Sequence, residues 1–278
     1  MSTVPVDARD PGAQSDPSDL VDLERYPVLE PGHVTLTDVI ERARDQLASI
    51  GAAELPGFIH PAGVAALVDD AESLEPVAHV SGGLGTVYLG LPDEDVAADH
   101  PRAYLGSYRV GAVAYDLFPA TSPMRALFEW EPLRAFVEAI LDRGEIHRYA
   151  DSLGALNLAT MGPGDELQWH FDQTDFVVSL AVRSSDRGGD FEVAPLIRTN
   201  DDERYDDVAG VLAGDTANVM ALPMRPGTLL VFEGRNSMHR VTPIAGDTTR
   251  LVGLFGYDTK SGTESSQLLK LVRYGRSA

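Results

Sequence analysis

The 278-residue sequence contains no cysteine. Disulfides and thiolate metal sites are therefore excluded, and any metal centre needs histidine and carboxylate ligands. Basic residues are also scarce, with 22 Lys and Arg against 43 Asp and Glu, so the formal net charge is -21. Because a strongly acidic surface repels polyanions, nucleic acids and anionic membranes are not expected as partners. The acidity either favours a cationic small molecule or serves solubility alone.

Long apolar runs are missing as well. No stretch approaches the ~18 apolar residues of a membrane span, and the N-terminus lacks the basic-then-apolar pattern of a signal peptide. Together with the absence of cysteine, this predicts a cytoplasmic protein. An apolar content of 44% and a charged content of 23% are typical of a globular chain.

The composition changes along the chain. Residues 1–30 are rich in Pro, Asp and Ser and poor in aromatics, which predicts a disordered N-terminal arm. Residues 31–278 are expected to form a single domain. Within it, helical patterns fill 35–145 as support, and strand patterns fill 146–275 as the core of the fold.

Helical spacing of apolar residues predicts helices over 35–50 and 61–74, the second beginning at Pro61. A third helix begins at Ser122-Pro123, breaks and restarts at Pro132, and ends by Gly144. These helices are expected to pack against a sheet.

Short strand patterns separated by turn residues dominate the rest of the chain. Residues 104–113 are either a strand or a loop, and the acidic stretch 198–219 is either an active-site lid or a solvated loop. The remaining expected strands are 53–59, 86–91, 155–161, 167–171, 176–183, 190–193, 228–232, 239–242, 250–257 and 268–274. The pattern predicts a mainly β protein with flanking helices (α+β), folded as a double-sheet, cupin-like jelly roll.

The segment Gln168-Trp169-His170-Phe171-Asp172 carries the clearest chemical signal. A histidine and an aspartate two residues apart on an extended chain point to the same face, so both can reach one metal ion. With the later His239 they make two imidazoles and one carboxylate, the ligand set of non-haem Fe(II) oxygenases. Arg250 follows one short strand later and suits the distal carboxylate of 2-oxoglutarate, because a guanidinium binds a carboxylate bidentately.

A single His-x-Asp pair is weak evidence, since it also occurs on surfaces and a lone buried histidine usually has a structural role. The combination of His170, Asp172, His239 and Arg250 in this order is far more specific.

At these residues the sequence resembles the Fe(II)- and 2-oxoglutarate-dependent dioxygenases, which are built on a double-stranded β-helix. Within that superfamily it is most similar to the carrier-independent amino-acid halogenases and their hydroxylating relatives. The resemblance extends from about Thr35 to Tyr274. The segments that carry it are Leu153-Gly154-Ala155-Leu156-Asn157, Met161-Gly162-Pro163-Gly164-Asp165, Trp169-His170-Phe171-Asp172, Gly188-Gly189-Asp190-Phe191-Glu192 and Asn236-Ser237-Met238-His239-Arg240-Val241.

The resemblance implies that His170, Asp172 and His239 bind the catalytic iron and that Arg250 binds 2-oxoglutarate, with Asn157 and Thr248 as further co-substrate candidates. The halogenases of this group carry a small residue at the position of Asp172, which opens a coordination site for chloride. Since Asp172 fills that site, the resemblance implies hydroxylation rather than chlorination.

The expected reaction consumes 2-oxoglutarate and O2 and hydroxylates an unactivated C–H bond of a free L-amino acid, with a basic amino acid among the options. Arg102 and Arg109 are candidates for its carboxylate. The candidates for an amine or a basic side chain are Asp175, Glu192 and Asp258, and Gln168 and Gln173 flank the motif. Each of these seven residues also has an ordinary structural explanation.

Two other functions stay open. The same iron site can desaturate or cyclise another small molecule of secondary metabolism. A non-catalytic β-barrel binding protein with a vestigial metal site is the alternative outside enzymes, and the intact ligand set argues against it. The substrate, the carbon oxidised and the oligomeric state are not determined by these residues.

Overall fold

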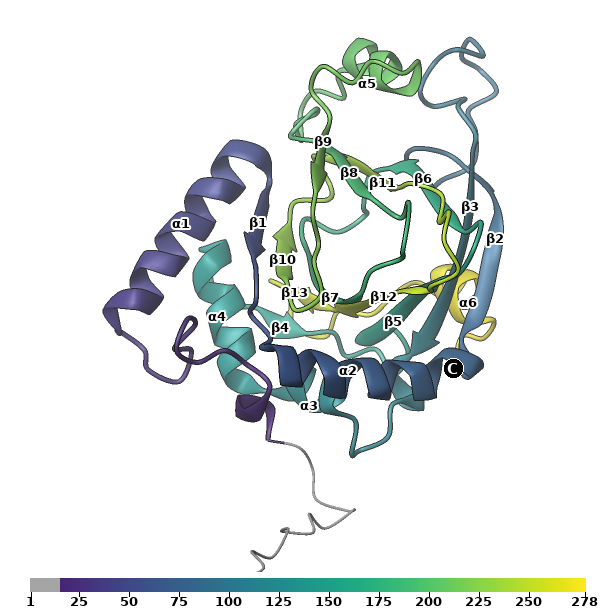
Figure 1. Ribbon diagram of the computed structural model, residues 1–278. Coiled ribbons are helices and arrows are strands. Elements are labelled where there is room, and N and C mark those ends of the chain that lie inside the picture. Colours follow the sequence, from purple (N-terminus) through teal and green to yellow (C-terminus); the bar gives the residue numbers. More distant parts are fainter. Residues whose placement is uncertain (1–15) are drawn as a thin grey trace, which may run out of the picture.

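The computed structural model describes residues 16–278, and its main feature is an antiparallel sheet rolled into a nearly closed barrel (Figure 1). The strands are β1 (Ala52–Leu55), β2 (His79–Gly85), β3 (Gly106–Ala114), β4 (His147–Arg148), β5 (Leu156–Met161), β6 (Glu166–His170), β7 (Val177–Arg183), β8 (Phe191–Ala194), β9 (Met220–Leu222), β10 (Leu229–Phe232), β11 (Met238–Val241), β12 (Arg250–Phe255) and β13 (Tyr257–Asp258). The predicted mainly β jelly roll with flanking helices is confirmed.

Eleven strands form one sheet in the order β1-β10-β7-β12-β5-β3-β6-β11-β8-β9, with β2 added on β3. Strand β3 joins the two halves, because its residues 111–114 pair with β5 while Tyr108 and Arg109 pair with β6. Strands β4 and β13 form a separate two-stranded ribbon. The residues 104–113, expected to be strand or loop, are therefore mostly strand.

Within residues 16–278, six α-helices accompany the sheet: α1 (Val34–Ile50), α2 (Pro61–Leu74), α3 (Pro123–Glu129), α4 (Glu131–Leu141), α5 (Tyr205–Leu212) and α6 (Gln267–Tyr274). In Figure 1, α1 and α4 lie to the left of the barrel, α2 and α3 lie below it, and α5 lies above it. The break expected near Pro132 is present, since Trp130 is extended between α3 and α4. None of the helices within residues 16–278 is both long and apolar enough to span a bilayer.

The disordered arm expected over residues 1–30 is wrong for residues 16–30; residues 1–15 lie outside the described part of the chain. Leu20, Val21, Tyr26 and Val28 are buried in the main core, where the Tyr26 ring lies 5.4 Å from the ring of Phe58. The few apolar residues of this Pro- and Asp-rich stretch therefore cover the base of the fold.

Other local expectations are corrected too. Residues 268–274 belong to helix α6 rather than an edge strand, since Ser266 caps its start and Gly275 ends it at a φ of 69°. Residues 86–91 form turns instead of a strand, with the Thr86 hydroxyl bonded to Gly90.

The expected strand 53–59 ends at Leu55, because the chain turns at Gly57, whose φ is 68°. The acidic stretch 198–219 contains α5, so it is only partly a loop; its role as a lid stays a prediction.

Candidate metal centre

Strands β6 and β11 bring the two motif histidines together. His239 pairs with His170, and Val241 pairs with Leu167, so three steps along β6 match two along β11. This is a β-bulge, a device that re-aims side chains and is common beside active sites. Because cross-strand partners share a face of the sheet, both imidazoles point the same way, with ring centroids 4.1 Å apart.

Backbone carbonyls fix how each imidazole is protonated. The Nδ1 atom of His170 lies 2.8 Å from the carbonyl oxygen of Gln168, and that of His239 lies 3.0 Å from the carbonyl oxygen of Ser237. Since a carbonyl oxygen only accepts, Nδ1 carries the proton and donates, which leaves the lone pair on Nε2. Each histidine therefore presents Nε2 as a ligand atom.

The carboxylate of Asp172 meets both of these nitrogens. Its Oδ1 lies 3.9 Å from His170 Nε2, and its Oδ2 lies 3.5 Å from His239 Nε2. The ligand atoms of the three residues all lie within 4.8 Å of one another. Burial, followed by the neighbouring His239, lowers the pKa of His170 to about 4, so this imidazole is neutral and available as a ligand at pH 7. Two imidazoles and one carboxylate on one side of a shared point fit Fe(II).

Arg250 supplies a buried cation near this centre. The residue is only 8% exposed, and its guanidinium makes no ion pair or hydrogen bond with any residue from 16 to 278. Burial lowers its pKa to about 10 despite the opposing charge of Asp190, so it remains protonated at pH 7. A buried cation without a partner is costly, which favours binding of an anion at this position.

The guanidinium opens onto a cavity of about 260 Å³. Its lining residues are Ser184, Ser185, Asp186, Arg187, Gly188, Gly189, Asp190, Phe191, Ala221, Leu222, Pro223, Met224 and Arg250. The ring of Phe191, one of these residues, lies 5.5 Å from the ring of His239. The cavity is therefore adjacent to the metal centre, as the co-substrate of such a centre requires.

The two weaker co-substrate candidates differ. Asn157 on β5 is buried, its Oδ1 has no partner among the described residues, and the strand register places it on the same face of the β5–β12 pair as Arg250. Thr248 uses both its backbone N–H and its hydroxyl to bind Asp186 in a turn. Asn157 is thus free to bind a ligand, whereas Thr248 has a structural role in this state.

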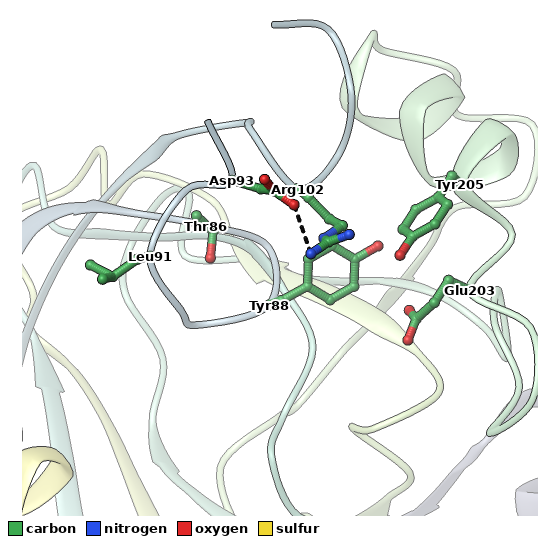
Figure 2. A pocket seen from close by; sticks show the side chains of 7 residues that line it. All are labelled: Thr86, Tyr88, Leu91, Asp93, Arg102, Glu203 and Tyr205. Atoms are coloured by element: carbon green, nitrogen blue, oxygen red, sulfur yellow. Dashed lines mark ion pairs between the residues drawn. The ribbon is translucent and has the colours of Figure 1, made fainter. Parts of the chain in front are cut away.

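Arg102 lines a second cavity, of about 230 Å³, together with Thr86, Tyr88, Leu91, Asp93, Glu203 and Tyr205 (Figure 2). Figure 2 shows its guanidinium beside the Tyr88 ring, with an ion pair of 2.7 Å to Asp93. The Tyr88 ring stacks on Phe171 at 5.5 Å, so this cavity adjoins the residue between the two ligands of the motif.

Several predicted substrate residues have structural partners instead. Arg109 forms an ion pair with Asp165. Glu192 pairs with Arg240 at 2.6 Å. Gln168 is buried and donates to the Thr86 carbonyl oxygen, so it contacts the 86–90 turn rather than the metal centre.

Asp175 and Gln173 lie in the loop that follows Asp172, and both are bound by Arg235. Asp258 makes no ion pair within residues 16–278, and its oxygens accept from the Lys260 N–H and the Thr263 hydroxyl in the following turn. Its charge acts on Tyr149, a residue that sequence reasoning missed. Burial, then the charges of Asp258 and Asp172, raise the pKa of Tyr149 to about 12, which places an acidic environment beside the metal centre.

The missed residues, Tyr149, Tyr88, Gly234 and Arg235, carry no local motif. Their roles depend on contacts between segments far apart in the chain, so no pattern along the sequence signals them.

A protein-family model described as Halogenase D matches residues 114–270. The sequence matches none of the curated proteins with which it was compared.

Solved structures share the fold at low sequence identity. A 2OG-Fe(II) oxygenase family oxidoreductase from Burkholderia pseudomallei is 15% identical, with 81% of this chain and 92% of that chain covered and a TM-score of 0.52. AviO1 from Streptomyces viridochromogenes Tue57 is 21% identical, covering 81% and 97%, with a TM-score of 0.55. HygX from Streptomyces hygroscopicus, with nickel, 2-oxoglutarate and hygromycin B bound, is 12% identical, covering 79% and 87%, with a TM-score of 0.51.

Proposed function

The chain belongs to the halogenase D family, and we propose that it hydroxylates an unactivated C–H bond of a free L-amino acid. It is a 2-oxoglutarate-dependent oxygenase, and its cofactors are Fe(II) and 2-oxoglutarate. The observation that carries the proposal is the meeting of His170, Asp172 and His239 beside the buried Arg250, whose guanidinium has no partner within residues 16–278.

The side chains have distinct tasks in this reaction. His170, Asp172 and His239 would hold Fe(II), which supplies oxidation by O2 coupled to the conversion of 2-oxoglutarate to succinate and CO2. Arg250 binds the distal carboxylate of 2-oxoglutarate, and the unpartnered Asn157 offers a further polar contact on the same face.

Water is excluded on one side of the centre by aromatic rings. The Phe232 ring lies 4.7 Å from the His239 ring, and the Phe191 ring lies 5.5 Å from it. Such apolar walls favour productive use of the oxidant on the substrate over side reactions.

Asp172 supports hydroxylation over halogenation. Its carboxylate oxygens lie against both imidazoles, where a small residue would leave an open position for a halide. A filled third position leaves the remaining sites for the keto acid and O2.

A basic amino acid fits the surroundings best. Asp258 has no cationic partner within residues 16–278, and its charge and that of Asp172 both act on Tyr149. Its oxygens accept hydrogen bonds only from neutral groups, the Lys260 N–H and the Thr263 hydroxyl among them. We assign Asp258 to a substrate amine, since a carboxylate without a cationic partner in a partly buried site favours a cation.

Both arginine candidates for the substrate carboxylate already have a carboxylate partner, Arg102 in Asp93 and Arg109 in Asp165. Arg102 is the better candidate because it lines the cavity of Figure 2.

A succinate-release assay across the free amino acids tests the proposal. The enzyme is supplied with Fe(II), 2-oxoglutarate, O2 and chloride, and products are analysed by mass spectrometry. A gain of one oxygen on an amino acid, greatest on a basic one, is expected, with His170→Ala as the inactive control. A gain of chlorine would overturn the assignment of Asp172.

The same assay separates the alternatives. Loss of two hydrogens would identify a desaturase or cyclase. If none of the amino acids gives succinate release, the search turns to another small metabolite, such as the class represented by hygromycin B in the HygX structure. If anaerobic Fe(II) and 2-oxoglutarate give no visible charge-transfer band, the chain is a binding protein rather than an oxygenase.

A further inference from the structure

The carboxylate of Asp172 is not held by hydrogen bonds of its own. Within residues 16–278 its side-chain oxygens accept none, and only its backbone N–H is bonded, at 3.0 Å to the carbonyl oxygen of Gly234. The two histidines, by contrast, are oriented through Nδ1. The position of this carboxylate must therefore come from the backbone and the space around it.

We infer that the turn formed by residues 233–237 is a positioning device for Asp172, in which Gly234 provides the space and Arg235 the anchor. The inference rests on the proposed role of Asp172 as a metal ligand. The turn itself is closed by the N–H groups of Asn236 and Ser237, which both donate to the carbonyl oxygen of Glu233.

Glycine at position 234 is needed for space rather than for backbone conformation. Its φ lies outside the left-handed region that favours glycine. A Cβ added there would lie 1.8 Å from Asp172 Oδ2, 2.6 Å from its Cγ and 2.9 Å from its Cβ. All three nearest atoms belong to the Asp172 side chain, so any larger residue displaces the carboxylate first.

Arg235 holds the loop on the C-terminal side of Asp172. Its Nε donates to Asp175 Oδ1 at 2.5 Å, and its Nη2 donates to the carbonyl oxygen of Gln173 at 2.6 Å. Two contacts from one rigid guanidinium fix the direction of the chain that leaves the ligand.

Arg198 holds the other side. Its Nε donates to the carbonyl oxygen of Arg235 at 2.7 Å, and its guanidinium carbon lies 3.9 Å from the ring centroid of Phe171. The residues before and after Asp172 are thus tied to the same turn. Outer residues of this kind tune metal binding by keeping a ligand in place.

The test is a double-mutant cycle read by metal affinity. Mn(II) is titrated anaerobically into metal-free wild type, Gly234→Ala, Asp172→Gly and the double variant. Gly234→Ala is expected to weaken binding roughly 10- to 100-fold in the wild-type background, the usual cost of losing an outer residue. In the Asp172→Gly background it should change binding less than about threefold, because the atoms it displaces are gone.

Two further measurements sharpen the result. Arg235→Gln should also weaken Mn(II) binding. Arg42→Gln, which changes an exposed arginine on α1, is the matched control and should leave Mn(II) binding unchanged. Gly210→Ala, at a glycine in α5 with open space around it, controls for adding a methyl group. The visible spectrum of bound Co(II) should show the same altered coordination in Gly234→Ala and Asp172→Gly.

The outcomes separate the two ideas. An equal loss from Gly234→Ala in both backgrounds, or no loss in the wild type, overturns the positioning role while leaving Asp172 as a ligand. Unchanged Mn(II) affinity in Asp172→Gly alone overturns the proposed ligand set itself.

Discussion

His170 and His239 reach the metal centre with their tautomers already fixed by backbone carbonyls, so little reorganisation is needed to bind a metal. Replacing either with alanine removes one of three ligands and should abolish both metal binding and succinate production. Mn(II) titration and a succinate assay check this. His33→Ala, which removes the residue that caps α1, is the matched control and should retain both.

Arg250 is expected to act on co-substrate binding rather than on turnover. Arg250→Gln removes charge-assisted hydrogen bonds worth roughly 1.5–3 kcal/mol, so the KM for 2-oxoglutarate should rise roughly 10- to 100-fold, with a smaller change in kcat. Steady-state kinetics with varied 2-oxoglutarate measure it. Arg187→Gln changes an exposed arginine at the same cavity and should leave KM nearly unchanged. An equal rise in both variants would point to general electrostatics instead.

Helix α6 is docked through its polar side. Lys270 is buried and lies 3.1 Å from Asp151, whose side chain is fully buried, while Leu268 is 71% exposed. Lys270→Met leaves that carboxylate without its cation, so the free energy of unfolding should fall by about 3 kcal/mol. Leu268→Ala in the same helix should change it by less than about 0.5 kcal/mol. Denaturant unfolding compares the two, and equal stabilities would show that the ion pair does not dock the helix.

The inverted burial of α6 also explains why it was expected to be a strand. The leucines of α6 are exposed instead of buried. The residues that are buried, Lys270 and Tyr274, look like surface residues in the sequence. Element boundaries set by local signals, such as Gly51 after α1 and Pro61 at the first position of α2, were predictable because these signals depend only on neighbouring residues.

At the scale of the whole molecule, metal and co-substrate binding should stabilise the fold. The ligands of the centre are His170 on β6, Asp172 in the loop that follows β6, and His239 on β11. The co-substrate arginine, Arg250, lies on β12, so binding links both halves of the barrel. At a hundredfold excess over Kd the gain is about 2.7 kcal/mol, which corresponds to roughly 5 °C in Tm for a chain of this size. Differential scanning fluorimetry with Mn(II) and 2-oxoglutarate measures it, and the shift should vanish in His170→Ala.

Much of this protein was determined by its sequence alone. The absence of cysteine restricted any metal to nitrogen and oxygen ligands, the strand patterns predicted the jelly roll, and the spacing of His170 and Asp172 placed both on one face. These are properties of composition and of neighbours along the chain, which local geometry controls.

Only the tertiary structure decided which other residues serve the centre. The cross-strand pairing of His239 with His170, the space that Gly234 leaves for Asp172 and the acidic environment of Tyr149 all join segments distant in the sequence. The packing of residues 16–30 is of the same kind. Such contacts depend on register and on shape complementarity in three dimensions, which no local pattern encodes.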